Sequence, residues 1–181
     1  MENNEEYQEY LEDMQKGYNL KSVPFEFRTK ELCEIAVTQK GLNLEYVPKV
    51  LRTKELCEIA LKDRAYALNY VPEELKTEKL CLAAVKKEAY SLQFVPKEIM
   101  TMEMCEAAVT QDGYASMLKF VPEDLKTPEL CELAVKENGF AIKFVPDKFK
   151  TLELCEIAVK ENGFALRDVP EELKTLEMCD V

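Results

Sequence analysis

Residues 151–163 read TLELCEIAVKENG, and this stretch decides the fold of the chain. Thr151 stands where a side-chain oxygen caps a helix, and Glu153 lies in the first turn, where the helix dipole favours an acid. The apolar residues form one stripe at helical spacing: Leu154, Cys155, Ala158 and Val159. Gly163 follows, and we expect it to close the helix in the left-handed conformation. The stretch predicts an α-helix of about three turns.

The same pattern returns along the whole chain. Its cysteines are 24 residues apart, with one interval of 26: Cys33, Cys57, Cys81, Cys105, Cys131, Cys155 and Cys179. A Thr precedes each Cys by four residues and a Val-Pro pair begins ten residues before it, while all five glycines share one further slot. That slot holds Ala65 and Ala89 in two copies, whose helices should end differently because left-handed Ala is strained. A fixed period of this length predicts a solenoid of stacked repeats.

Each repeat is predicted to contain a long α-helix, a short helix that ends at the Val before Pro, and a 3₁₀ turn. The predicted fold is therefore an all-α helical repeat solenoid of about seven 24-residue units over residues 17–181. Residues 1–16 hold six acids and one Lys, and their apolar residues have helical spacing, so we expect an acidic N-terminal capping helix there. The two extra residues within GYASMLKFVP fit either a surface insertion or a kink.

The motif VPEELKTxELCxxAVKxNGxAL, seen best over 121–144 and 145–166, resembles a family of tandem repeats of unknown function from bacterial and large-virus proteins. The likeness covers nearly the whole chain after residue 16, and it implies an α-helical repeat fold without implying an activity. The repeat length is also similar to that of leucine-rich variant repeats. Some of those proteins carry an iron–sulfur cluster in a cysteine-rich segment that this chain lacks, so we expect no cofactor.

The composition weighs against several classes of function. The chain has no His, and its glutamates recur once per repeat rather than in one unique pair, so we do not expect an enzyme. A net charge of −11 disfavours direct nucleic-acid binding. No apolar run is long enough to span a membrane, and the N-terminus is acidic where a signal peptide is basic and apolar, so we expect a cytoplasmic protein.

Two residue columns carry most of the remaining charge. The basic column contains Arg28, Arg52, Lys76, Lys126, Lys150 and Lys174. The acidic column contains Glu31, Glu55, Glu103, Glu129, Glu153 and Glu177. We expect the two columns to pair between layers. The cysteines are expected to be small buried hydrophobes, because one thiol per layer suits neither disulfides nor a metal site.

A solenoid offers long surfaces to protein partners, and two regions depart from the repeat background. The first is an apolar stripe after the capping Thr, formed by Met102, Pro128, Leu152 and Leu176 with Met100 beside it. These side chains could bind a partner or could pack on the neighbouring layer. The second is the acidic N-terminal segment with Glu5, Glu6, Glu9 and Glu12, which could dock on a basic surface or could serve solubility and capping.

These regions lead to two functional hypotheses. The first is a non-enzymatic interaction module that binds a protein partner through the stripe. The alternative is an acidic inhibitor that occludes the basic channel of a nucleic-acid-binding defence protein, as anti-CRISPR proteins do. The last predicted helix contains few residues, so it could also pair with a second copy and give a homodimer through the C-terminal end.

Overall fold

The computed structural model describes residues 2–111 and 115–179 of the chain. All its regular secondary structure is helical, and no described residue lies in a strand. This confirms the all-α class and the repeating array of a long helix followed by 3₁₀ helices. Gly113 and Tyr114 of the segment GYASMLKFVP lie outside the described ranges, so the alternatives for the insertion stay open. None of the described helices combines the length and apolar character needed to cross a membrane.

The α-helices are α1 (Glu2–Gln15), α2 (Lys30–Gln39), α3 (Lys54–Asp63), α4 (Glu78–Lys87), α5 (Met102–Val109), α6 (Pro128–Glu137), α7 (Leu152–Glu161) and α8 (Leu176–Cys179). A six-residue 3₁₀ helix follows most of them: η3 (Gly41–Tyr46), η5 (Ala65–Tyr70), η7 (Ala89–Phe94), η9 (Ala115–Phe120), η10 (Gly139–Phe144) and η12 (Gly163–Asp168). The three-residue 3₁₀ turns are η1 (Leu20–Ser22), η2 (Phe25–Phe27), η4 (Lys49–Leu51), η6 (Glu73–Leu75), η8 (Lys97–Ile99), η11 (Asp147–Phe149) and η13 (Glu171–Leu173). The predicted short helix of each repeat is thus a 3₁₀ helix.

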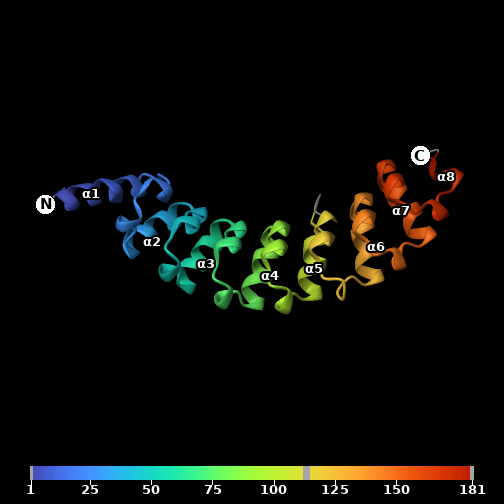
Figure 1. Ribbon diagram of the computed structural model, residues 1–181, viewed down its shortest axis with the longest axis horizontal. Helices are drawn as coiled ribbons and strands as arrows, with labels where there is room; N and C mark the ends of the chain where they lie inside the picture. Colours follow the sequence, from blue (N-terminus) through green and yellow to red (C-terminus); the bar gives the residue numbers. More distant parts are fainter. Residues whose placement is uncertain (1, 112–114, 180–181) are drawn as a thin grey trace. The chain divides into compact units, whose positions relative to one another are not determined.

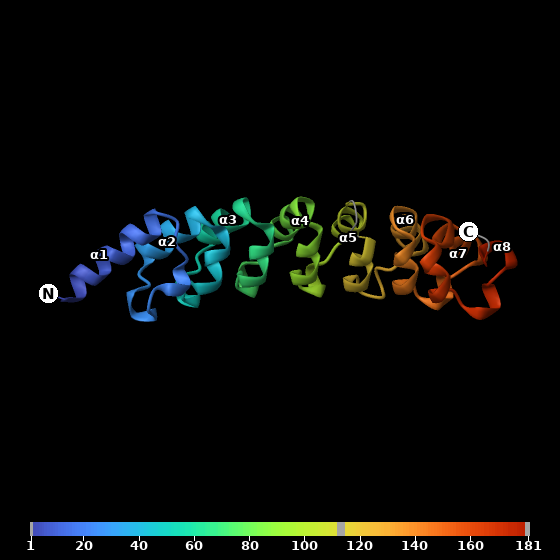
Figure 2. The same ribbon diagram turned by 90° about the horizontal axis from the view of Figure 1, so that it is seen from above.

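The chain forms two compact units, residues 1–80 and 81–181, which divide within α4. In the first unit, α1 packs against α2, α2 packs against α3, and η3 contacts both α2 and α3. In the second unit, α5, α6 and α7 lie side by side in chain order, as Figure 1 and Figure 2 both show. There η10 lies between η9 and η12 and contacts both. Each unit therefore consists of an α-helical layer and a 3₁₀ layer.

The predicted Thr caps are present in both units. The Thr151 hydroxyl accepts a hydrogen bond from the backbone N–H of Leu154 at 3.2 Å, and Thr53 does the same for Leu56 at 3.3 Å. The four apolar residues behind the cap are buried in α2, α3, α5, α6 and α7, for example Leu154, Cys155, Ala158 and Val159 in α7. The local pattern read from the sequence therefore forms the core of each layer.

The prediction that a left-handed glycine closes the helix holds at Gly17 after α1 but is wrong at Gly41, Gly139 and Gly163. The residues that end α2 and α6 are Lys40 and Asn138, with extended backbone at φ −147° and −160°. Among the described residues, only Gly17 has a positive φ, at 81°. A Cβ on Gly41 would instead overlap the carbonyl oxygen of Ala60 in the next helix. Close approach of the next repeat calls for glycine at Gly41 and Gly139, whereas Ala65 carries a Cβ in the same slot. Among the described residues no alanine has a positive φ, so Ala65 is free of left-handed strain.

The predicted pairing between the basic and acidic columns is also wrong. The lysines pair within their own repeat, with an acid three residues earlier: Lys76 with Glu73, Lys126 with Glu123, Lys150 with Asp147 and Lys174 with Glu171, at 2.6–2.9 Å. Residues three apart overlie each other on a 3₁₀ turn, which brings these charges together. Arg28 donates instead to the carbonyl oxygens of Val23 and Tyr46, both at 2.9 Å.

The acidic column has other partners. Glu103 accepts from Lys86 of the preceding α-helix at 2.6 Å, so a pair between layers does form, but with a different lysine. The pKa of Glu129 lies below its usual value because its own backbone N–H and the Thr127 hydroxyl donate hydrogen bonds to its carboxylate. The glutamates thus belong to the helix caps, as their position in the first turn suggested.

Candidate functional site

The predicted apolar stripe is partly exposed. Pro128 begins α6 and is exposed, Leu152 begins α7 with 44% of its surface exposed, and Leu176 begins α8 with 86% exposed. Met102 is half-buried at the start of α5. Met100 needs a correction, because it is only 8% exposed and lines a separate groove instead of joining the stripe. Met100 occupies the position of the basic column and directly follows the 3₁₀ turn η8, so its side chain belongs to the 3₁₀ layer.

A groove of about 190 Å³ lies between α6 and α7, beside the stripe. Its lining consists of Pro128, Glu132, Phe149, Thr151, Glu153, Leu154 and Ile157. Leu154 is almost fully buried at its floor, while Phe149 and Ile157 are half-buried on its walls. Glu132 forms an ion pair with Lys136 at 2.5 Å. The groove therefore has an apolar interior and a charged rim, as peptide-binding surfaces do.

Phe149 and Ile157 also line the groove, although their places in the sequence did not lead us to expect them there. The sequence does contain a pattern that indicates this surface. Two residues after four of the cysteines stands a large apolar residue outside the four buried positions of the helix: Ile35, Ile59, Leu133 and Ile157. Ile59 is 37% exposed and the other three are half-buried, so this position borders the surface. A fifth apolar position on an already buried helix face indicates a second, more open contact surface.

A further exposed column went unnoticed in the slot directly after the glycine slot. Its described members are Tyr18, Leu42, Tyr66, Tyr90, Phe140 and Phe164, and every one is among the exposed large apolar side chains, at 37–77% exposure. The signal was available, since a large apolar residue follows the end of each helix where a turn is usually polar. Each described member lies in or just before a 3₁₀ helix of its own unit, and none of them lines the α6–α7 groove.

The acidic residues of α1 are placed as expected. Glu5, Glu6, Glu9 and Glu12 are all exposed. The opposite side of α1 packs on α2, where the Tyr7 hydroxyl lies 2.9 Å from the Thr29 hydroxyl and Met14 is fully buried. The ring of Tyr10 lies 5.4 Å from that of Phe27, and its hydroxyl donates to Glu6 at 2.9 Å, which raises the pKa of Tyr10. The four glutamates thus share a solvent-facing side of a packed helix.

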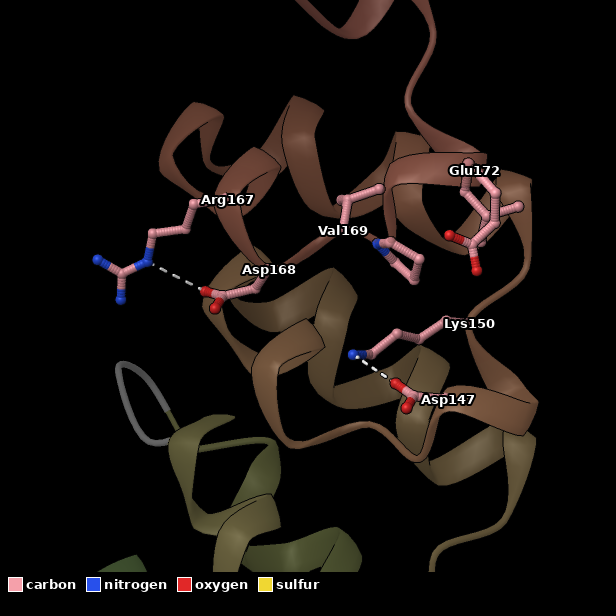
Figure 3. Close-up of a pocket in the computed structure, with 8 residues that line it drawn as sticks. Asp147, Lys150, Arg167, Asp168, Val169 and Glu172 are labelled. Carbon is pink, nitrogen blue, oxygen red and sulfur yellow. Dashed lines mark hydrogen bonds and ion pairs between the residues drawn. The ribbon is translucent and has the colours of Figure 1, made fainter.

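The 520 Å³ hollow shown in Figure 3 lies between η11 and η13, and its lining carries one more negative than positive charge. Lys150 pairs with Asp147 at 2.9 Å, and Arg167 pairs with Asp168 at 3.2 Å. Glu172 adds a further carboxylate to the lining, so cations are outnumbered three to two. The dashed contacts in Figure 3 show each of the two cations paired with a carboxylate of the lining. This arrangement offers no site for an anion.

The cysteines form a buried column without reactive character. Cys33, Cys57, Cys81, Cys105, Cys131 and Cys155 are free and buried. Burial raises the pKa of Cys33, Cys57, Cys105 and Cys131 to about 11, so these thiols stay protonated at neutral pH. Within 2–111 and 115–179, no group of three or more Cys, Asp or Glu could hold a metal ion. The cysteines contribute to packing, as the spacing predicted.

Comparison with known proteins places the repeats. Five overlapping segments match a family described as Domain of unknown function (DUF4116): residues 29–76, 53–100, 77–126, 101–150 and 127–174. Each match begins at a helix-capping Thr and covers two consecutive repeats, and together they cover most of the chain. No curated protein and no solved structure matches the chain.

Proposed function

Because the chain belongs to the family described as Domain of unknown function (DUF4116), we propose its function from its own surface: a non-enzymatic helical repeat module that binds a protein partner. The partner would occupy the α6–α7 groove together with the exposed side chain of Leu152. The free thiols suit a reducing compartment, so the proposal places this binding in the cytoplasm.

The groove itself carries this proposal. Phe149, Leu154 and Ile157 present apolar surface within a concave lining, and Leu152 is exposed at the start of the same helix. Covering the exposed part of one leucine contributes on the order of 1 kcal/mol, so a partner that covers the groove and Leu152 gains several times that amount. Glu132 and Glu153 on the rim would orient a partner with complementary charge.

The test compares affinity capture from cells by the natural protein and by Leu152→Asp and Ile157→Ala variants. Val50→Asp is the matched control, because Val50 is 91% exposed and belongs to the other unit. A partner lost with both groove variants and kept by the control supports the proposal. Partners retained by folded groove variants, as judged by circular dichroism, would remove the groove from the proposal.

We also propose an alternative that rests on α1. Its exposed glutamates Glu5, Glu6, Glu9 and Glu12 would let the protein act as an acidic inhibitor that occludes a basic nucleic-acid channel. Binding of this kind weakens steeply with salt, whereas binding in an apolar groove does not. Replacing the four glutamates by glutamine should abolish only the salt-sensitive binding. Salt-resistant capture that survives this replacement would contradict the inhibitor.

A further inference from the structure

The basic column is interrupted once, at Met100. The other repeats carry an arginine or a lysine there, and the arginines show what that residue does. Arg52 donates to the carbonyl oxygens of Val47, Glu45 and Tyr70 at 2.7–3.0 Å, which ties its own turn to the next repeat. Arg28 makes the corresponding bond to Tyr46. The column residue therefore fills the space between two successive 3₁₀ turns and satisfies carbonyl oxygens there.

Met100 cannot donate these hydrogen bonds. In the arginine repeats, the carbonyl oxygens of Tyr46 and Tyr70 accept a hydrogen bond from the column arginine. The carbonyl oxygen of Phe120 has the corresponding place in the sequence, and Met100 offers it no such donor. A groove of about 370 Å³ remains in the second unit, with apolar lining from Leu92, Val95, Met100, Phe120, Val121 and Pro122. This volume is in the range of pockets that hold a small ligand or a large side chain. A hollow also lies at the corresponding place beside Lys150, so Met100 does not create the groove but makes one of its walls apolar.

The rim of the groove is basic. Lys97, Lys119 and Lys126 line it together with a single acid, Glu123. Lys126 is 8% exposed and pairs with Glu123 at 2.6 Å, whereas Lys97 and Lys119 form no ion pair with any residue in the described ranges. The Nζ atom of Lys119 lies over the Phe120 ring, 4.6 Å from the ring centre. Three lysines against one glutamate give this lining a charge of +2, in a chain whose net charge is −11.

We propose that this groove binds an acidic peptide segment with one apolar side chain. The apolar side chain would lie on Met100 and Phe120, and flanking carboxylates would pair with Lys97 and Lys119. A peptide suits the charges better than a nucleic acid does, because a run of phosphates would meet only two uncommitted lysines and an otherwise acidic protein. The site shares no residue with the α6–α7 groove and depends on the proposed function only in taking a peptide as its ligand.

The test uses the full chain with ¹³C-labelled methionine methyl groups, so that Met100 reports on the groove. The probe is a capped peptide of sequence Asp-Glu-Phe-Glu-Asp, with Asp-Glu-Ala-Glu-Asp and Lys-Lys-Phe-Lys-Lys as matched peptides. We expect the first peptide to shift the Met100 signal in a saturable manner. The alanine and lysine peptides should bind at least about tenfold more weakly, since each lacks one of the two interactions. The proposal would be overturned if the first peptide left the Met100 signal unshifted, or if it bound no more tightly than the two matched peptides.

Met100→Arg is the most informative variant. It restores a basic residue in the column and keeps the lining of the groove positively charged, but its larger side chain fills the groove. We therefore expect intact folding and loss of peptide binding. The double variant Lys97→Glu, Lys119→Glu should weaken binding by about tenfold or more, while Lys143→Glu, an exposed lysine outside the groove, should not. Retained binding in both groove variants, or tighter binding of an eight-residue oligothymidine, would overturn the proposal. Leu152→Asp should leave the peptide affinity unchanged, which separates this site from the α6–α7 groove.

Discussion

The backbone carbonyl oxygen of Ala60 lies against Gly41, so close that a Cβ on Gly41 would overlap it. The same relationship holds between Gly139 and Ala158 in the second unit. In each pair, the first residue of a 3₁₀ helix contacts the α-helix of the next repeat. This contact sets the distance between two successive repeats. The slot is therefore a packing position at Gly41 and Gly139, whereas Gly17 follows α1 with a positive φ and has open space around it.

Gly41→Ala should lower the free energy of unfolding by about 2 kcal/mol or more, because the added methyl group meets fixed backbone rather than a movable side chain. Urea titration followed by circular dichroism measures this change. Gly17→Ala is the control: its φ of 81° makes the substitution costly by about 1 kcal/mol, but no atom lies within 4 Å of the new Cβ. A smaller effect at Gly41 than at Gly17 would contradict the packing explanation.

Ser91→Ala should stabilise the protein by about 1 kcal/mol, because a buried hydroxyl without a partner costs free energy that a methyl group does not. The Ser91 hydroxyl is fully buried and has no hydrogen-bond partner among the described residues. Corresponding slots hold Ala67, Ala141 and Ala165. Thermal unfolding of the two proteins measures the difference, and a lower melting temperature for the variant would show that the hydroxyl is bonded in solution.

Asn43→Ala should have the opposite effect in the same slot. The Asn43 side chain accepts from the backbone N–H of Leu20 at 3.0 Å and donates to the carbonyl oxygen of Ala36 at 2.8 Å. Its removal leaves the buried N–H of Leu20 without this partner, while the carbonyl oxygen of Ala36 keeps its bond from the N–H of Lys40, so the change should cost about 1–2 kcal/mol. Urea titration of this variant beside Ser91→Ala provides the comparison, and equal signs for the two changes would refute this account of the slot.

Arg52→Met should destabilise the first unit by about 2 kcal/mol or more, since three carbonyl oxygens lose a charged donor. Glu103→Gln is the contrast, because Glu103 and Lys86 are both more than half exposed and such pairs contribute roughly 0–1 kcal/mol. Chemical denaturation measures both. If the glutamate change costs more, the basic column is not the stronger link between repeats.

The buried thiols predict a loss of stability in alkali. The pKa of Cys105 is raised from 9.0 to about 11 by burial, so the folded protein holds this proton more tightly than the unfolded chain does. The resulting stabilisation is complete below pH 9 and is lost as the pH rises towards 11. Unfolding midpoints measured between pH 7 and 11 should fall above pH 9, and Cys105→Ala should fall less steeply. An identical slope in the variant would contradict the assignment.

Short-range patterns made the helices predictable. A Thr hydroxyl reaches the N–H three residues later in any chain, so the cap at Thr151 and the buried Leu154 follow from local spacing. The Cys column could be assigned for the same reason, because its helical phase matches that of the other buried residues. Exposure of Leu152 was left open by the sequence, since it depends on how far the neighbouring α6 lies from α7.

The period, the capped α-helices and the four buried apolar positions of each helix could be read from the amino-acid sequence, because they depend on contacts within one repeat. The contacts between one repeat and the next became known from the three-dimensional structure alone. It showed that Gly41 makes room for Ala60, that Arg28 bonds the carbonyl oxygen of Tyr46, and that Met100 lines a groove. These contacts depend on the distance between successive repeats. A difference of about one ångström decides whether a Cβ fits or whether a carbonyl oxygen can accept a hydrogen bond. The spacing of residues along the chain does not reveal that distance.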